Sequence, residues 1–145
     1  MKFSCSVVID RPLDEVVDLF KDASKLGEYQ EGFVKKELIS GREGEEGAVA
    51  KMYYKQGKRE MVITETILRN YLPHEFLGSY HHEHMDNTMR CNFKALSRNQ
   101  TQYDSHIEYT AFRGFLPRLI STLFPSVFKK QVQRWLDNFK AYAES

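Results

Sequence analysis

Three of the chain's five histidines fall within one short stretch, SYHHEHMDNTMRCNF, at residues 79–93. The stretch also contains Glu83, Asp86 and Cys91, so nitrogen, oxygen and sulfur atoms that bind metals or transfer protons lie close together in sequence. A zinc site, a general acid or base, and an ordinary hairpin are the three interpretations that these residue types allow. The strand register decides which side chains meet.

A turn centred on Asp86 and Asn87 gives the stretch a definite register. The predicted cross-strand pairs are Glu83 with Arg90, His82 with Cys91, His84 with Met89, and Tyr80 with Phe93. Because side chains alternate along a strand, the predicted inward face holds Phe76, Tyr80, His82, His84, Met89, Cys91 and Phe93. The predicted outward face holds His81, Glu83, Arg90, Asn92 and Lys94.

The following turn predicts the faces of the next strand in the same way. A three-residue loop of Arg98, Asn99 and Gln100 separates apolar from charged side chains cleanly. The inward set is Tyr103, Ser105, Ile107 and Tyr109, and the outward set is Asp104, His106, Glu108 and Thr110. In the strand around Met61–Leu68 both faces mix polar and apolar residues, so its inward face is left unassigned.

Two inward histidines beside a cysteine allow specific chemistry. His82, His84 and Cys91 could bind zinc, but no fourth ligand and no signature spacing is present, so neither a metal nor another cofactor is expected. His82 or His84 could instead act as a general acid or base toward a carbonyl substrate, with Tyr80 or Tyr109 holding the ligand oxygen. The plainer alternative is that these groups only satisfy one another in the core.

Composition limits the possible partners. The chain has 145 residues, 41% hydrophobic and 28% charged, which suits a single domain over residues 1–145. Its 21 Lys and Arg against 20 Asp and Glu give no general attraction to nucleic acid. Cys5 and Cys91 form no CxxC pair and the first residues do not form a signal peptide, so a cytoplasmic location is expected.

The elements that must position these residues follow from periodicity. A strand over residues 3–10 leads to a helix beginning near Pro12, then to a second helical turn or a loop ending at Gly27. About six short strands with tight connections follow, which predicts an antiparallel meander. The last third is an amphipathic helix interrupted at Pro125, either a short helix and a longer one or a single kinked helix. Its predicted apolar stripe is Ile120, Phe124, Val127, Phe128, Val132, Trp135, Leu136, Phe139 and Tyr142.

Four motifs in this order resemble the START-like superfamily, which includes polyketide cyclases, lipid-transfer domains and many small bacterial proteins. They are VVIDRPLDEVVDLFKD (7–22), SGREGEEGAVAKMYYK (40–55), ITETILRNYLPHEF (63–76) and FKKQVQRWLDNFKAYAE (128–144). The resemblance implies an α+β helix-grip fold: a curved seven-stranded antiparallel sheet around a long C-terminal helix, with two short helices after the first strand. It also implies an apolar cavity between sheet and helix.

A small hydrophobic molecule bound or carried in that cavity is therefore the expected function. The alternatives are a cyclase-like or dehydrase-like enzyme using an inward histidine, and a non-catalytic interaction module with a filled core. The residues expected to contact the ligand are Tyr80, His82, Met89, Cys91, Phe93, Ser105, Ile107, Tyr109, Phe128 and Trp135. Ligand identity, catalysis and oligomeric state stay open.

The C-terminal region has a local basic excess in a nearly neutral chain. A proline in the same region has several large apolar residues around it: Phe115, Leu116, Leu119, Leu123 and Phe124. Together these features predict either transient contact with an anionic membrane surface or the solvated face of a core helix. The charged residues concerned are Arg113, Arg118, Lys129, Lys130, Arg134 and Lys140, against Asp137.

Overall fold

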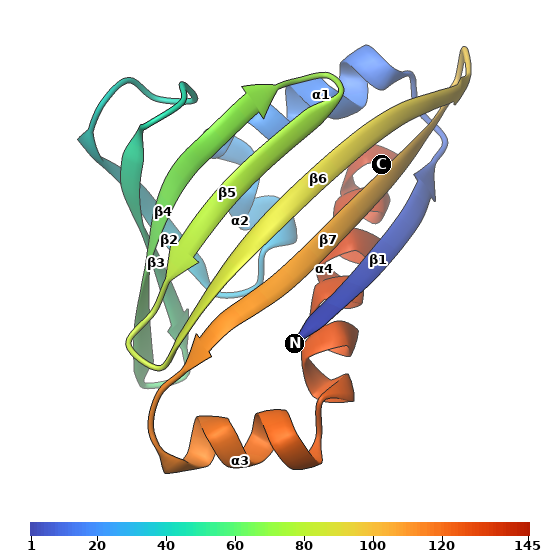
Figure 1. The fold of residues 1–145 in the computed structure, drawn as a ribbon. Coiled ribbons are helices and arrows are strands. Elements are labelled where there is room, and N and C mark those ends of the chain that lie inside the picture. Colours follow the sequence, from blue (N-terminus) through green and yellow to red (C-terminus); the bar gives the residue numbers. More distant parts are fainter.

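One antiparallel sheet curves around helix α4 (Ser126–Ala143) in the computed structural model, which describes residues 1–145 (Figure 1). Its seven strands lie in the order β1-β7-β6-β5-β4-β3-β2, so β1 and β2 are the edges. This confirms the expected α+β helix-grip architecture. The strands are β1 (Lys2–Ile9), β2 (Phe33–Ser40), β3 (Val49–Gln56), β4 (Arg59–Tyr71), β5 (Glu75–His81), β6 (Met85–Ser97) and β7 (Gln100–Phe112).

Short helices connect β1 to β2. Helix α1 (Leu13–Lys21) begins after Pro12, with Asp14 and Glu15 in the first turn, where carboxylates interact favourably with the helix dipole. A single 3₁₀ turn, η1 (Ala23–Lys25), leads to the one-turn helix α2 (Leu26–Tyr29). Of the two predicted alternatives the helical turn is the one present, and it continues past Gly27 to Tyr29.

The C-terminal region forms two helices, as one of the two alternatives predicted. Helix α3 (Phe115–Leu123) ends at Leu123, because the next residue, Phe124, has a φ of −132° and a ψ of 55°, which are not helical. Pro125 then precedes α4. A proline disfavours helical geometry in the residue before it, which explains the break. No helix of the protein is long and apolar enough to cross a membrane.

The inward stripe of α4 is narrower than the sequence predicted. Val132, Leu136 and Phe139 are buried, but Trp135 is 39% exposed and Val127 is 53% exposed. Helix α4 packs mainly on β1, and its first turn together with α3 extends past the sheet. The expectation that Trp135 lines the interior is wrong, because it lies beside the stripe rather than on it.

The hairpin β5–β6 turns earlier than predicted. Its tip is His82–His84 rather than Asp86 and Asn87, and the pairs are His81 with Asp86, Gly78 with Met89, and Phe76 with Cys91. In each observed pair the two residue numbers therefore add up to a total that is six lower than in the predicted register. An even shift leaves every strand residue on its predicted face, so Tyr80, Met89, Cys91 and Phe93 still point inward.

A distant arginine stabilises the observed tip. Arg113, just after β7, donates to the carbonyl oxygens of His82 and Glu83 and to both carboxylate oxygens of Asp86. His81 Nδ1 lies 2.6 Å from Asp86 Oδ1. Asp86 is thus held in a strand by Arg113 and His81 instead of occupying the turn, which the local sequence does not reveal.

Two further local predictions are corrected. The predicted pair of Glu83 with Arg90 does not form, since Arg90 Nε lies 3.9 Å from Glu75 Oε1. The β6–β7 turn has two residues, because Ser97 pairs with Gln100 and a bulge follows Ala95. The main register again shifts by an even number, so the inward set Tyr103, Ser105, Ile107 and Tyr109 keeps its face.

The structure also settles the strand whose face the sequence left unassigned. In β4 the buried or part-buried inward residues are Met61, Ile63, Glu65 and Ile67. Val62 and Leu68 lie on the outer face, 40% and 48% exposed. A carboxylate therefore lies on the inner face of the sheet.

Candidate ligand-binding site

The inner face of the sheet is packed very differently at its two ends. The end near α1 and α2 is called here the sealed half (Figure 1). An aromatic cluster closes the interior there. The ring of Phe20 from α1 lies 5.0 Å from Phe93 and 6.5 Å from Phe139, and Phe93 stacks on Tyr103 at 4.6 Å between centroids. Phe93, Tyr103 and Phe139 are 2–5% exposed. This half resembles an ordinary protein core.

At the opposite end, near α3, inward-facing side chains keep contact with solvent. Burial decreases toward this end along the central strands: β5 goes from buried Phe76 to part-buried Tyr80, and β6 from buried Cys91 to part-buried Met89. This end, called here the open half, is defined by the part-buried inward side chains Met61, Ile63, Tyr80, Met89, Tyr109 and Phe128. Apolar side chains that face inward without being sealed are available to a ligand.

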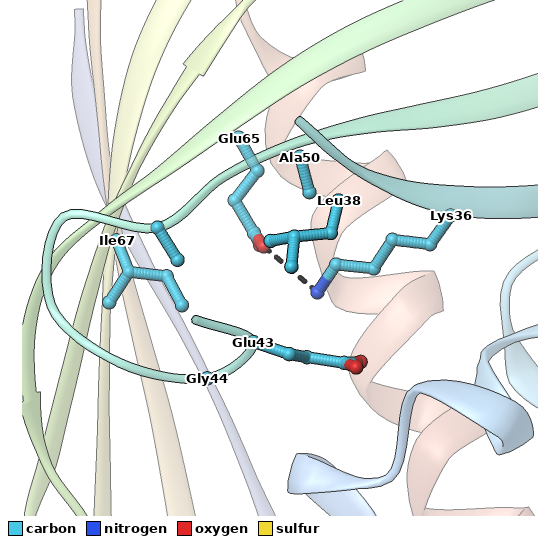
Figure 2. A pocket seen from close by; sticks show the side chains of 8 residues that line it. Lys36, Leu38, Glu43, Gly44, Ala50, Glu65 and Ile67 are labelled. Carbon is cyan, nitrogen blue, oxygen red and sulfur yellow. Dashed lines mark ion pairs between the residues drawn. The ribbon is translucent and has the colours of Figure 1, made fainter. Parts of the chain in front are cut away.

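A polar cluster adjoins the open half on the inner face (Figure 2). Lys36 Nζ from β2 lies 3.0 Å from Glu65 Oε1, and the Tyr80 hydroxyl donates to Glu65 Oε2 at 2.9 Å. The Glu65 side chain is 9% exposed and the Lys36 side chain 20% exposed. A carboxylate at this depth needs such partners, because an isolated buried charge is costly.

Burial and the neighbouring Glu65 carboxylate raise the pKa of Tyr80 well above its usual 10. The phenol therefore stays protonated at neutral pH and acts as a hydrogen-bond donor to Glu65. Its remaining lone pair can accept a hydrogen bond from a ligand.

Gly78 makes room for this arrangement. A Cβ built at Gly78 would lie 2.6 Å from the Tyr80 hydroxyl oxygen and 2.8 Å from the Tyr80 ring. The Tyr80 side chain thus folds back along its own strand over the glycine, and this directs the hydroxyl toward β4. Any larger residue at position 78 would displace the ring.

The other side of the polar cluster borders a small cavity under the β2–β3 loop. Its volume is about 50 Å³, and Lys36, Glu43, Ala50, Glu65 and Ile67 are among the lining residues (Figure 2). That volume fits a water or two. An organic molecule needs several hundred Å³, so this cavity is not the ligand site.

The predicted contact residues separate into three groups. Cys91, Phe93, Ser105 and Ile107 are at most 4% exposed and belong to the packed interior. Trp135 lies at the surface. The members that reach the open half are Tyr80, Met89, Tyr109 and Phe128, and His82 lies at the hairpin tip at the same end of the molecule.

The predicted histidine cluster does not form on the inner face. His82 and His84 lie in the tip, with ring centroids 5.5 Å apart, whereas Cys91 lies in the middle of β6 opposite Phe76. No group of three or more His, Cys, Asp or Glu side chains is arranged to hold a metal ion. The alternative of a zinc site at His82, His84 and Cys91 is therefore wrong, because the earlier turn removes both histidines from the strand.

His82 is held by its own turn. The backbone N–H of His84 donates to His82 Nδ1 at 3.1 Å, which places the proton of the neutral ring on Nε2. Burial and the neighbouring His84 lower the pKa of His82, so the ring is neutral at neutral pH. To accept a proton at Nδ1, the ring would first have to release the backbone of the tip.

Sequence reasoning missed Lys36 and Glu65, the charged residues of the polar cluster. The available signal was weak: Glu65 alternates with Ile63 and Ile67 in a strand whose two faces look alike. Lys36 lies in an edge strand in which Val34, Leu38 and Ile39 are 46–57% exposed. Their pairing depends on β2 and β4 flanking β3, which only the sheet order provides.

Several solved structures are similar to this chain. An aromatase/cyclase from a Streptomyces species matches with a TM-score of 0.80 and 11% identity, covering 99% of this chain and 93% of that chain. A START superfamily protein from Mycobacterium smegmatis matches with a TM-score of 0.77 and 7% identity, covering 99% and 97%. A conserved protein from Geobacillus kaustophilus matches with a TM-score of 0.81 and 13% identity, covering 99% and 95%.

At such low identity these matches show the fold and not the activity. No protein-family model matches the chain, and no curated protein sequence matches it.

Proposed function

We propose that this chain, which has the START-like fold, binds a small apolar molecule against the open half of its inner sheet face. One observation carries the proposal: Ile63, Tyr80, Met89 and Tyr109 face inward yet remain only part-buried, while the equivalent positions of the sealed half are covered. A bound molecule would remove this apolar surface from water, which stabilises the complex by about 25 cal/mol per Å².

The polar cluster favours a neutral ligand with a hydroxyl group. Glu65 and Lys36 balance each other in charge, so the site offers no net attraction to an anion or a cation. The Tyr80 O–H donates to Glu65, and the hydroxyl oxygen has a lone pair that can accept a hydrogen bond from the ligand. An aromatic alcohol combines an apolar surface with the one donor that this site can accept.

A carrier role fits this geometry better than the enzyme alternative. His82 at the open end is part-buried, and its pKa is lowered, but its Nδ1 already accepts the His84 backbone N–H. A general base must have a free lone pair within reach of the substrate proton. General-base catalysis by His82 would therefore require the tip to rearrange first.

Isothermal titration calorimetry with 2-naphthol and with naphthalene tests the proposal. We expect wild-type protein to bind both and Tyr80→Phe to lose roughly tenfold affinity for 2-naphthol, because one hydrogen bond is removed. Naphthalene, which has no hydroxyl group, should bind both proteins alike.

A matched pair of variants locates the binding surface. Met89→Trp fills the open half and should weaken 2-naphthol binding at least tenfold, whereas Arg90→Trp places the same ring on the outer face and should leave binding unchanged. Equal effects of the two variants, or no heat from wild-type protein, would contradict the proposal and support a filled-core interaction module.

A further inference from the structure

Helix α3 and the bend that follows it, residues 124–127, form an apolar surface with no partner in the protein. This bend is called here the elbow. Helix α3 buries none of its residues completely and lies across one end of the molecule, beyond the sheet (Figure 1). Its exposed members, with those of the elbow, are Phe115 (81%), Leu116 (61%), Leu119 (38%), Leu123 (58%), Phe124 (58%) and Val127 (53%). This set is called here the elbow patch. So many large apolar side chains exposed together mark an interaction surface.

The helical residues of the elbow patch share one face. At about 100° per residue, Phe115, Leu116, Leu119 and Leu123 fall within an arc of about 100° around the axis of α3. The part-buried residues Pro117, Ile120 and Ser121 point away from that arc, toward the protein. Helix α3 is thus amphipathic, but its most apolar side faces solvent instead of packing on the protein.

The charges around the elbow patch have one sign. Residues 114–136 contain Arg118, Lys129, Lys130 and Arg134 and no aspartate or glutamate. All four cations are exposed, and none forms an ion pair with a carboxylate. By contrast, Arg113 is paired with Asp86 and Lys140 with Glu144.

Basic residues of α4 lie on the same outward-facing side of the helix as Val127 of the elbow patch. Val127, Lys130 and Arg134 are three and then four positions apart, so they lie on one side of α4, roughly opposite the buried stripe of Val132, Leu136 and Phe139. The surface therefore changes from apolar at α3 to basic along the start of α4. This is the order in which a bilayer presents acyl chains and anionic headgroups.

We propose that the elbow patch docks the protein onto an anionic lipid bilayer, with α3 lying in the interface and Lys130 and Arg134 against the headgroups. The nine residues of α3 are too few to span a bilayer, so the attachment is peripheral and reversible. A second protein copy is less well matched, because two such patches would place four unpaired cations against four others. The proposal is independent of whether the open half holds a ligand.

Vesicle co-sedimentation tests the docking directly. We expect wild-type protein to sediment with phosphatidylcholine vesicles that contain phosphatidylserine, to bind pure phosphatidylcholine vesicles much more weakly, and to be released by high salt. Lys130→Gln with Arg134→Gln should lower binding to the anionic vesicles roughly 30-fold.

The apolar part of the patch has a matched control. Phe115→Ser with Leu123→Ser should lower binding at least roughly tenfold, because two apolar side chains no longer enter the interface. Val34→Ser with Ile39→Ser removes exposed apolar residues of β2, 57% and 49% exposed, and should leave vesicle binding unchanged. Urea unfolding of each variant establishes that the protein is folded.

Fluorescence quenching gives a readout of depth. Trp135 is the only tryptophan, so a Trp135→Phe background can carry Phe115→Trp or Ile39→Trp as a single reporter. Acyl chains bearing bromine should quench the reporter at position 115 and not the one at position 39. Equal binding to neutral and anionic vesicles, equal quenching of the two reporters, or a wild-type dimer that Phe115→Ser dissociates would overturn the proposal.

Discussion

The two halves of the inner sheet face have similar residue types but different packing. In the sealed half, α1 supplies Phe20 and the C-terminal part of α4 supplies Phe139, and these rings close over Phe93 and Tyr103. In the open half, α4 contributes Phe128, which contacts Tyr109 and Phe112, while Tyr80 and Met89 stay part-buried. Apolar composition alone therefore does not distinguish core from binding surface.

The halves differ because the helices cover the sheet unequally. Helix α4 lies mainly along β1, and α1 crosses β6 and β7 at the sealed end. No long helix crosses β4 and β5 at the open end (Figure 1). A helix-grip domain can thus keep a stable core at one end while its other end stays accessible.

Substitution of one phenylalanine of α4 in each half compares the packing of the two halves directly. We expect Phe139→Ala to lower the free energy of unfolding by about 3–5 kcal/mol, because a fully buried ring leaves a cavity. Phe128→Ala should cost less than about half of that, since the ring is already part-exposed. Urea denaturation of both variants measures the difference. Equal losses would mean that the open half is packed as tightly as the sealed half.

Breaking the ion pair between Lys36 and Glu65 should have the next largest effect on stability. Lys36→Met leaves the buried Glu65 carboxylate without its cation and should destabilise the protein by about 3 kcal/mol. Adding Glu65→Gln removes the unpaired charge and keeps an acceptor for Tyr80, so most of the loss should be recovered. Urea denaturation of the single and double variants checks this. A double variant as unstable as Lys36→Met would show that charge is not the cause.

The tip at the open end adds a pH dependence. Hydrogen bonds from Arg113, with a smaller contribution from His81, bring the pKa of Asp86 down to about 2, although partial burial acts in the opposite direction. Because the folded value lies below the unfolded value of about 4, the stabilisation is complete above that pH and is lost as pH falls toward 2. The difference in unfolding free energy between wild type and Asp86→Asn should therefore shrink over this range.

Asp18→Asn provides the control for this titration. Asp18 forms an exposed ion pair with Lys21 at 3.7 Å, so its replacement should change stability by less than about 0.5 kcal/mol at any of these pH values. An Asp86→Asn difference that stays constant with pH would contradict the assigned role of Arg113.

The smallest effect concerns the thiols of the interior. Burial raises the pKa of Cys91 to about 12 and also raises the pKa of Cys5, so neither forms much thiolate at neutral pH. The native protein should react with a disulfide reagent only after denaturation. Ser97→Cys adds an exposed thiol and should react at once. Rapid labelling of Cys91 in the native state would mean that solvent reaches the sealed half.

Much of the fold could be predicted, because it depends on features that persist along the chain. The proline starting α1, the turn residues between strands and the period of α4 each act within a few residues. The inward faces of β6 and β7 were predicted correctly although both turns were misplaced, because alternation depends only on whether a shift is even or odd. The candidate site was predicted less well, since four of its ten predicted contact residues belong to the packed core and Trp135 lies at the surface.

The order of elements, the inward faces of β5, β6 and β7 and the basic character of the C-terminal third follow from the sequence alone. Only the tertiary structure decided where the β5–β6 hairpin turns, because Arg113 reaches it from more than twenty residues away. Only the sheet order brought Lys36 to Glu65 and Tyr80. Local periodicity sets which side of an element is apolar, whereas the packing of whole elements decides which apolar sides are covered and which are left for a partner.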